Sequence, residues 1–203
     1  MDEPCSGRCR NNPAGAPPRH GKGPTSYWMQ DPDTVFRELD LNDGEVFLDL
    51  GCGPGDYSLH AARLVGECGH VYAVDHEEDR LDMLRERARD AGLTNVEVIS
   101  GNICDPLPLG NSTIDVCLLS TVLHCLVRDS GYAPLFREIR RVMKPGGRLC
   151  IIECKKEEMP FGPPLSMRVS AGDLEDCVPA YGFHKDGLAD LGYNYLIRFV
   201  PAE

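Results

Sequence analysis

The chain has 203 residues, of which 21 are Lys or Arg and 32 are Asp or Glu, so its formal net charge is −11. This length suits one domain with a sizeable core. The acidic excess disfavours nucleic acid as a partner, because binding to a phosphate backbone depends on Lys and Arg. No apolar run is as long as a transmembrane helix, and the polar start, MDEP, does not resemble a signal peptide. We therefore expect a cytoplasmic protein with no membrane span.

Residues 1–30 differ in composition from the rest of the chain. The stretch up to residue 26 is rich in Pro, Gly and Asn and offers little apolar surface, which predicts a flexible arm. The segment Asp31-Pro32-Asp33 is typical of a helix start, and the apolar residues after it share one helical face. We expect residues 31–203 to form a single domain behind this arm.

Strands and helices are predicted to alternate through this domain. Apolar runs and alternating patterns predict strands at 46–50, 70–74, 95–100, 114–119, 148–153, 184–191 and 195–200. Helical periodicity predicts helices at 57–64, 78–91, 133–142 and 171–181, with a turn at 144–147. This order predicts an α/β fold, a doubly wound and mainly parallel sheet with helices on both faces.

The most informative segment runs from the first strand to Asp75, at the end of the second. Three glycines stand on alternate positions after the first strand, at Gly51, Gly53 and Gly55. Only a residue without Cβ lets the backbone bend sharply and lie directly against a ligand. A carboxylate at the tip of the second strand can accept both hydroxyl hydrogens of a ribose. Together these features predict a nucleotide-type site in an open α/β sheet.

Two cofactors compete for this pattern. A dinucleotide site has the spacing G-x-G-x-x-G and directs a helix N-terminus at a pyrophosphate. Here the spacing is G-x-G-x-G, with Asp49 before the turn and Asp56 after it. Carboxylates in these places would repel a pyrophosphate, but they suit a cofactor that carries an ammonium and a sulfonium. The pattern therefore favours S-adenosylmethionine.

The stretch from Leu48 to Gly55, LDLGCGPG, resembles motif I of the class I S-adenosylmethionine-dependent methyltransferases. Further similar segments are Gly101-Asn102-Ile103, Leu107-Pro108-Leu109, Asp115 and Arg141–Gly147. Together they resemble the small methyltransferases of quinone-biosynthesis type, from Asp33 to about residue 200. The resemblance implies a Rossmann-like sheet of seven strands with the last one antiparallel. It also implies methyl transfer to a small-molecule acceptor with release of S-adenosylhomocysteine, and leaves the acceptor atom open.

The resemblance also implies roles for individual residues. The glycine N–H groups would meet the methionine part of the cofactor, and Asp75 the ribose. Asp49 would meet the ammonium directly or through water, or else hold the amides of the turn. His76 would stack near the adenine or be an ordinary loop residue, and Asn102 would accept from the adenine amino group, where the family usually has Asp. The predicted cofactor-binding residues are Asp49, Gly51, Cys52, Gly53, Gly55, Asp75, His76, Asn102, Ile103 and Ser120.

One position departs from the family pattern. Five residues beyond the ribose acid, similar enzymes often carry a Met or Leu that packs on the adenine, but this chain has Arg80. Two solutions are open. Either Leu81 or Ile103 supplies the apolar contact, or the guanidinium plane of Arg80 stacks on the ring.

The acceptor is expected beside the loop that follows the fourth strand. His124 in this loop is a candidate general base, because an imidazole titrates near neutrality; the alternative is a structural histidine bonded to backbone at a helix start. The arm residues Tyr27, Trp28 and Met29 are predicted to form a lid over the acceptor, or else to anchor the arm on the outer helices. Tyr57 and Thr121 are placed on the same substrate side.

Ten cysteines is a high count. Five of them, Cys52, Cys117, Cys125, Cys150 and Cys154, fall in or beside apolar runs and are predicted to be buried and reduced. The C-x3-C pair Cys5 and Cys9 lacks a second pair nearby, so no metal site is predicted. Two alternatives to an ordinary methyltransferase remain open: a non-catalytic cofactor-binding sensor, and a thiophilic, arsenite-type enzyme. The second would use Cys52, Cys104, Cys125, Cys154 and Cys177.

Overall fold

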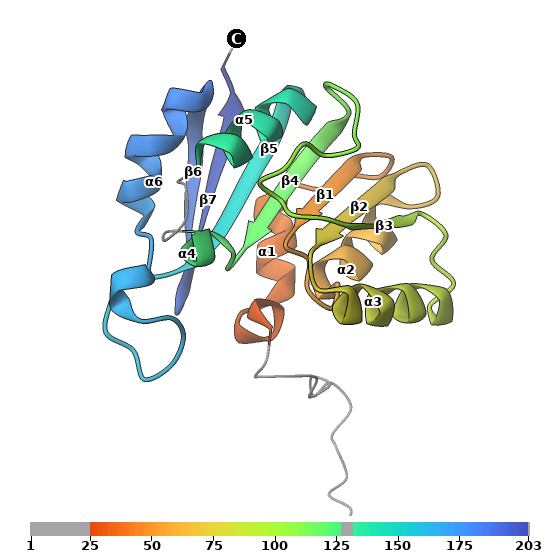
Figure 1. Ribbon diagram of the computed structural model, residues 1–203, viewed down its shortest axis with the longest axis horizontal. Helices are drawn as coiled ribbons and strands as arrows, with labels where there is room; N and C mark the ends of the chain where they lie inside the picture. Colours follow the sequence, from red (N-terminus) through yellow and green to blue (C-terminus); the bar gives the residue numbers. More distant parts are fainter. Residues whose placement is uncertain (1–24, 127–131, 203) are drawn as a thin grey trace, which may run out of the picture.

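The computed structural model describes residues 25–126 and 132–202, so most of the predicted arm, with Cys5 and Cys9, lies outside the described residues. One sheet of seven strands runs through the molecule in the order β3-β2-β1-β4-β5-β7-β6 (Figure 1). The strands are β1 (Val46–Leu50), β2 (His70–Asp75), β3 (Val96–Ser100), β4 (Ile114–Ser120), β5 (Met143–Cys154), β6 (Phe183–Leu191) and β7 (Asn194–Pro201).

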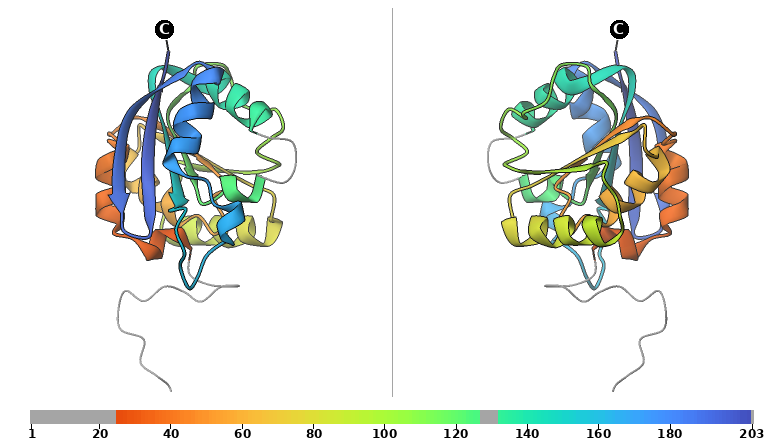
Figure 2. Two further views of the ribbon diagram at one scale, coloured as in Figure 1. Left: turned by 90° about the vertical axis from the view of Figure 1, so that its left-hand side faces the viewer. Right: turned by 90° about the vertical axis from the view of Figure 1, so that its right-hand side faces the viewer.

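Helices cover both faces of this sheet. The α-helices are α1 (Pro32–Leu39), α2 (Asp56–Val65), α3 (Glu78–Asp90), α4 (Leu123–Leu126), α5 (Ala133–Val142) and α6 (Ala171–Cys177). Three short 3-10 helices are η1 (Ser26–Met29), η2 (Leu165–Met167) and η3 (Val178–Tyr181). Figure 2 shows α1 on one side of the sheet and α5 and α6 on the other.

The strand directions confirm the predicted fold class. β1 to β5 pair in parallel, and β7 runs antiparallel to both β5 and β6. From β1 the chain moves outward through β2 and β3, and it then returns to the other side of β1 with β4. Strand order therefore reverses between β1 and β4, and this reversal is where open α/β sheets bind ligands, beyond the carboxyl ends of the strands.

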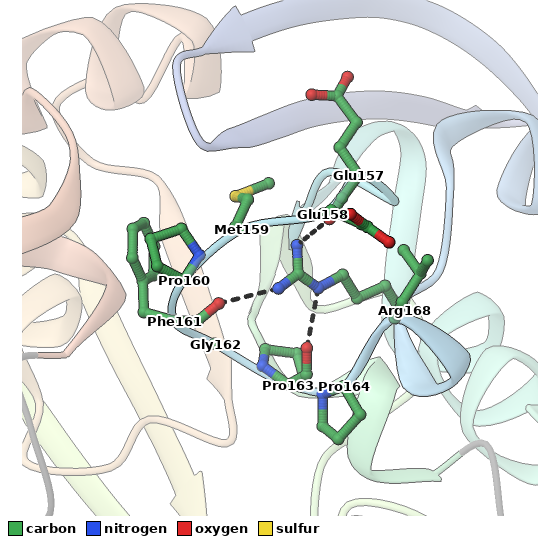
Figure 3. Close-up of a pocket in the computed structure, with 10 residues that line it drawn as sticks. Glu157, Glu158, Met159, Pro160, Phe161, Gly162, Pro163, Pro164 and Arg168 are labelled. Carbon is green, nitrogen blue, oxygen red and sulfur yellow. Dashed lines mark hydrogen bonds between the residues drawn. The ribbon is translucent and has the colours of Figure 1, made fainter.

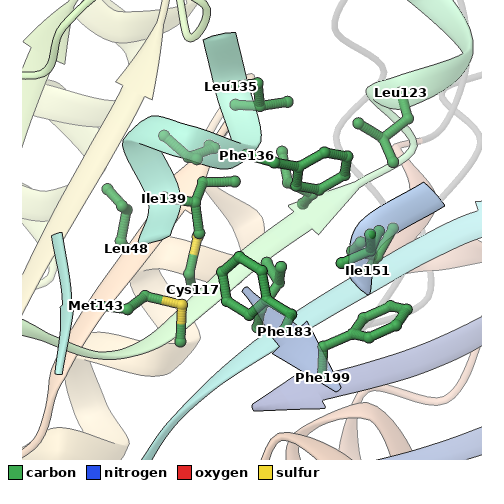
Figure 4. Packing of buried hydrophobic residues seen from close by; sticks show 14 of the residues in the cluster. Leu48, Cys117, Leu123, Leu135, Phe136, Ile139, Met143, Ile151, Phe183 and Phe199 are labelled. Carbon is green, nitrogen blue, oxygen red and sulfur yellow. The ribbon is translucent and has the colours of Figure 1, made fainter. Parts of the chain in front are cut away.

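Alternation along β1 shows how the core is divided. Leu48 and Leu50 belong to the cluster under α5 and α6, whereas Phe47 belongs to the cluster under α1 and α2. Figure 4 shows the first cluster, where Phe136 of α5 packs above the sheet. Asp49 occupies the next position on the α2 side and is 2% exposed. A carboxylate in a place that alternation assigns to an apolar side chain indicates a role other than packing.

Three details of the prediction need correction. The helix predicted at 171–181 divides into α6 and η3, because Pro179 has no N–H to continue the α-helical ladder. The turn predicted at 144–147 is part of β5, which begins at Met143 with a register shift opposite Ile114 and Val116. Cys125, predicted to be buried, is exposed, because α4 is a short helix at the edge of a cavity.

The other four cysteines predicted to be buried are buried, and none of the eight cysteines within the described ranges forms a disulfide. Among residues 25–126 and 132–202, none of the helices combines the length and the apolar character that crossing a bilayer requires.

Candidate cofactor and acceptor site

The glycine turn follows β1 and is held against the neighbouring strand. The N–H groups of Gly51 and Cys52 both donate to the carbonyl of Val74 in β2, over 2.8 and 3.0 Å. Gly55, with a φ of +79°, then caps α2. A Cβ added to Gly51 would lie 2.5 Å from Cγ2 of Val122, so the turn also contacts the segment after β4. Both neighbours of β1 therefore shape the turn at the point where strand order reverses.

Asp75, the last residue of β2, holds this turn from a second side. Its Oδ2 accepts a hydrogen bond from the N–H of Gly53 over 2.8 Å, and its Oδ1 accepts one from the N–H of Glu77 over 3.0 Å. The carboxylate is almost fully buried, yet it lines a cavity of about 620 Å³, an ordinary size for a small-molecule site. Because a carboxylate offers about four acceptor positions, Asp75 keeps capacity for the two hydroxyls of a ribose.

This cavity, called the cofactor cavity below, lies at the carboxyl edge of the sheet. Its lining residues are Gly51, Asp75, His76, Glu77, Arg80, Asn102, Ile103, Cys104, Thr121, Val122, Cys125 and Leu126. Five predicted cofactor residues are among them: Gly51, Asp75, His76, Asn102 and Ile103. Oδ1 of Asn102 already accepts a hydrogen bond from the N–H of Cys104 over 2.9 Å, so an adenine amino group would share this oxygen with the loop.

The other predicted cofactor residues support the cavity from behind and are not part of its lining. They are Asp49, Cys52, Gly53, Gly55 and Ser120. Oδ2 of Asp49 accepts a hydrogen bond from Oγ of Ser58 over 2.6 Å, which ties β1 to α2. Oγ of Ser120 lies 2.8 Å from Oγ of Ser26 and so ties β4 to η1. The proposed alternative for Asp49, that it holds the turn amides, is not what the structure shows, because its partner is a side chain of α2.

The environment of Asp49 predicts a pH dependence. Burial raises the pKa of Asp49 to about 7 against the lowering effect of the Ser58 hydrogen bond, and the charges of Asp75 and Asp56 add to the rise. The unfolded chain holds this proton only below about pH 4. The native state therefore binds more protons between about pH 4 and 7, and stability falls as the pH rises through that window.

We accordingly expect the wild type to lose stability relative to Asp49→Asn between pH 5 and pH 8, by at most about 1.4 kcal/mol per pH unit. Denaturant unfolding of both proteins at a series of pH values measures the difference. Stability curves that stay parallel across this range would contradict the prediction.

A second cavity of about 580 Å³ adjoins the first, since Thr121 lines both. It is called the acceptor cavity below, and its lining residues are Thr25, Ser26, Met29, Thr121, His124, Cys154, Phe161, Gly162, Pro163 and Tyr193. The rings of Phe161 and Tyr193 meet edge to face, 4.8 Å apart, and both side chains are exposed. Lining atoms are thus mostly carbon, and neither a carboxylate nor a Lys or Arg side chain of the described residues lines this space.

His124 lines the acceptor cavity and is held in place by a buried acid. Its Nδ1 donates to Oε2 of Glu153 over 2.9 Å, and Oε1 of Glu153 accepts the N–H of Leu123 over 2.7 Å. Glu153 lies at the carboxyl end of β5 and is 1% exposed. Burial lowers the pKa of the imidazole, but hydrogen bonds with Cys125 and Glu153 and the charge of Glu153 outweigh this effect, so the pKa of His124 lies above its ordinary value.

The wall opposite η1 is a loop, residues 155–168, organised by one buried arginine. Arg168 is 5% exposed. Its Nε donates to the carbonyl of Pro163, Nη2 to that of Phe161, and Nη1 to those of Lys155 and Glu157, over 2.6–3.2 Å. Figure 3 shows the guanidinium at the centre of the loop, beside a hollow of about 580 Å³. The loop that presents Phe161 to the acceptor cavity is therefore held through its backbone.

The segment 25–30 lies across the carboxyl edge of the sheet and is bonded to it on several sides. Oγ1 of Thr25 donates to Oδ2 of Asp56 over 2.7 Å, and the hydroxyl of Tyr27 lies 2.9 Å from Nδ1 of His60. Tyr27 and Trp28 do not line the acceptor cavity; they border a separate hollow over α2 and α3. This geometry matches the anchoring alternative for these two aromatic residues.

The acceptor cavity is lined instead by three other residues of the same segment, Thr25, Ser26 and Met29. Tyr57, predicted on the substrate side, is 5% exposed and accepts a hydrogen bond from Nε2 of Gln30. Met29, predicted at this place together with Tyr27 and Trp28, lines the cavity. Local sequence gave no signal for Phe161 or Arg168, whereas Glu153 had one, because an acid at the carboxyl end of a central strand lies at the ligand edge.

Among the described residues, the five cysteines of the thiophilic alternative do not line one common cavity. Cys104 and Cys125 line the cofactor cavity and Cys154 lines the acceptor cavity, while Cys52 and Cys177 line neither. Within the part of the chain that the structure describes, no three His, Cys, Asp or Glu side chains gather in a way that could hold a metal ion. The geometry therefore gives the arsenite-type alternative no support.

Comparison with known proteins agrees with this geometry. A family described as a methyltransferase domain matches residues 41–178. The demethylmenaquinone methyltransferase of Bacillus subtilis is 30% identical over 130 residues, which cover 64% of this chain and 54% of that protein. The protein of the same name from Listeria welshimeri is 35% identical over 133 residues, covering 66% and 53%. The chain thus spans about half the length of the curated relatives it matches.

Among solved structures, a SAM-dependent methyltransferase from Aquifex aeolicus superposes with a TM-score of 0.80 at 30% identity, covering 89% of this chain and 94% of that one. The [4+2]-cyclase SpnF, with a TM-score of 0.71 at 20% identity over 84% and 80% of the two chains, shares the fold. The family match covers more than half of the sequence and includes the glycine turn, Asp75 and His124. The chain therefore belongs to the methyltransferase domain family.

Proposed function

We propose that this protein is a methyltransferase that uses S-adenosylmethionine to methylate a small-molecule acceptor and releases S-adenosylhomocysteine. S-adenosylmethionine is the cofactor, in keeping with the family and with the structural relative from Aquifex aeolicus. The observation that carries the proposal is the pair of adjoining cavities that share Thr121, one with a ribose-type acid and the other mostly apolar. A nucleoside and an acceptor would meet where the two cavities join.

The residues of the cofactor cavity fit this group. Asp75 offers acceptor positions to the ribose. Because Gly51 has no Cβ, the turn can pack directly against Val122, where a Cβ would clash, and its backbone stays accessible to a ligand. The bound cofactor supplies a methyl group already activated on a sulfonium. This chain then has to align the acceptor atom with the methyl group and the sulfur, and such alignment can lower the barrier by about 7–11 kcal/mol.

For the acceptor, we propose a quinone-type ring. The curated relatives are named demethylmenaquinone methyltransferases, and the acceptor cavity has side chains that suit a planar apolar ring. Met29 and Phe161 offer apolar contact, while His124 offers a polar ring edge: Nδ1 is bonded to Glu153, and Nε2 is the nitrogen through which an acceptor oxygen would be held. The ring nitrogen would hold an oxygen of the acceptor and set its orientation.

His124 would act as a donor in this arrangement and not as the general base of the initial hypothesis. A raised pKa keeps the imidazole protonated at neutral pH, so it cannot readily take a further proton. An imidazolium in a carbon-lined cavity stabilises an acceptor oxygen that carries negative charge. Methyl transfer to an electron-rich ring would benefit, because that charge makes the ring a better nucleophile.

The contact between His124 and Glu153 should be visible in the titration of His124. In Glu153→Gln the imidazole keeps its burial and its hydrogen bond with Cys125 but loses the carboxylate, so we expect the pKa of His124 to fall from its raised value. The His124 imidazole signal in NMR spectra, assigned with His124→Gln, reports this directly. Because the folded pKa of wild-type His124 is raised, its contribution to stability is complete below about pH 6.5, the unfolded pKa, and declines as the pH rises from there through the folded pKa. An unchanged titration in Glu153→Gln would show that Glu153 does not set the charge of His124.

The proposed activity is tested with isotopically methyl-labelled S-adenosylmethionine, using demethylmenaquinone that has first been reduced chemically to its quinol, the nucleophilic form of the ring, as the first acceptor and a metabolite extract as the second. Label in an acceptor, and formation of S-adenosylhomocysteine that depends on it, would support a methyltransferase. Label transfer to extract compounds but not to demethylmenaquinone would overturn the acceptor alone. Tight cofactor binding with no labelled product from either source would favour the non-catalytic sensor.

A further inference from the structure

Arg80 reaches from the first turn of α3 into the cofactor cavity. Its Nη1 lies 3.3 Å from the place where a Cβ on Gly53 would stand, so the guanidinium sits beside the glycine turn. It also lines the cavity together with Asp75 and Ile103. Its side chain is 47% exposed, which leaves a face of the guanidinium open to a ligand.

A chain of hydrogen bonds ties Arg80 to the ribose acid. Oδ1 of Asp75 accepts the N–H of Glu77, and Oε2 of Glu77 accepts Nε–H of Arg80 over 2.7 Å. The backbone N–H of Arg80 also donates to the carbonyl of Glu77 over 3.0 Å. The position of the guanidinium is therefore fixed relative to Asp75 through a single intermediate residue.

The same cavity has an apolar side chain in its lining. Ile103, in the loop after β3, is 8% exposed and lines the cavity. Leu81, the other candidate for an adenine contact, is fully buried in the cluster that joins α3 to β2 and does not line the cavity. Of the two apolar candidates that the sequence left open, only Ile103 is therefore placed to contact a ligand, and Arg80 lines the same space.

The charges around Arg80 indicate what kind of group it can hold. It is the only Lys or Arg among the described residues that line the cofactor cavity, and Asp75 and Glu77 lie beside it. Two carboxylates beside the guanidinium would repel a phosphate. The ion pair between Arg80 and Glu77 also reduces the net positive charge that Arg80 presents to a ligand. What remains is a flat guanidinium face, which suits the π face of a neutral base.

We propose that Arg80 and Ile103 clamp the adenine of the cofactor, with the guanidinium plane stacked on one face of the base. This proposal rests on the proposed function, since it assumes that S-adenosylmethionine occupies this cavity. The ribose on Asp75 directs the base toward the segments after β2 and β3, where Arg80 and Ile103 stand. The adenine is then recognised by stacking, and this contact should be the same for S-adenosylmethionine and for S-adenosylhomocysteine.

Binding calorimetry tests the clamp with three ligands: S-adenosylmethionine, S-adenosylhomocysteine and adenosine. Arg80→Ala should weaken all three by a similar factor of about fivefold, the size of an exposed cation–π contact. Arg80→Lys keeps the charge but loses the plane that stacks on the base, so its affinities should fall between those of Arg80→Ala and the wild type. Arg80→Met should stay close to the wild type, because a thioether packs well on an aromatic face.

Arg85→Ala is the matched control, because Arg85 lies on the same helix, pairs with Glu78 and Asp82, and does not line the cavity. Affinities in Arg80→Ala equal to those of Arg85→Ala would overturn the clamp, as would wild-type affinity in Arg80→Lys. Loss of S-adenosylmethionine affinity with unchanged adenosine affinity would also overturn it. Asp75→Ala separates the two proposals: if it weakens binding while Arg80→Ala does not, the clamp fails and the cofactor site stands.

Discussion

Replacing Asp75 with alanine should weaken binding of S-adenosylmethionine by about tenfold to a hundredfold. The ribose hydroxyls would lose a charged acceptor, which is worth about 1.5–3 kcal/mol. The N–H groups of Gly53 and Glu77 would lose their partner at the same time, so the turn itself would become less ordered. Calorimetric titration of the purified variant measures the change in dissociation constant.

Asp79→Ala is a suitable control, since Asp79 is an exposed acid in the first turn of α3 and does not line the cavity. It removes the same charge from the same region, so equal losses in the two variants would indicate a general electrostatic effect and not a ribose contact. An unchanged dissociation constant in Asp75→Ala, with thermal unfolding intact, would mean that the ribose site lies elsewhere.

Replacing Gly55 with alanine should destabilise the fold by about 2–5 kcal/mol. A Cβ at this position would stand 2.2 Å from Cδ1 of Leu84, which is fully buried in α3. Overpacking of this kind costs about 1–3 kcal/mol, and the left-handed backbone adds about 1–2 kcal/mol for any residue with a Cβ. Denaturant unfolding of the variant measures the sum.

Gly92 offers the matched comparison, because its φ is +67° and nothing lies within 4 Å of an added Cβ. Gly92→Ala should show the backbone cost alone, and the difference between the two variants then isolates the contact with Leu84. Equal destabilisation in both would show that α3 moves away from Gly55 without cost.

The sequence was sufficient for the fold class, the family and the cofactor, and the comparisons and the sheet confirm all three. The reason is that the information is local. Gly51, Gly53 and Gly55 lie within five residues of each other, and Asp75 ends the next strand, so one short segment specifies the turn and its acid. The roles of individual residues stay predictions, although Asp75, Ile103 and Gly51 lie where the resemblance places them.

The acceptor cavity could not be predicted in the same way, because its walls come from distant parts of the chain. Glu153 is 29 residues from His124, and Ser26 is 94 residues from Ser120. No periodicity encodes such pairings, since they follow from which strands end side by side. The misplacement of Trp28 has the same cause: its large side chain suggested a ligand contact, but the direction of η1 turns it toward α2 and α3.

The backbone bracing by Arg168 has a consequence for how new acceptors are acquired. Four backbone carbonyls accept hydrogen bonds from the Arg168 guanidinium. Because every residue type has a backbone carbonyl, these bonds in loop 155–168 do not depend on the side chains at the accepting positions. Phe161 can therefore be exchanged without dismantling the scaffold that holds its position. A family built on such a loop can diversify its substrates by single substitutions on a constant frame, and a library randomised at residue 161 with Arg168 retained is the natural starting point for redirecting this protein.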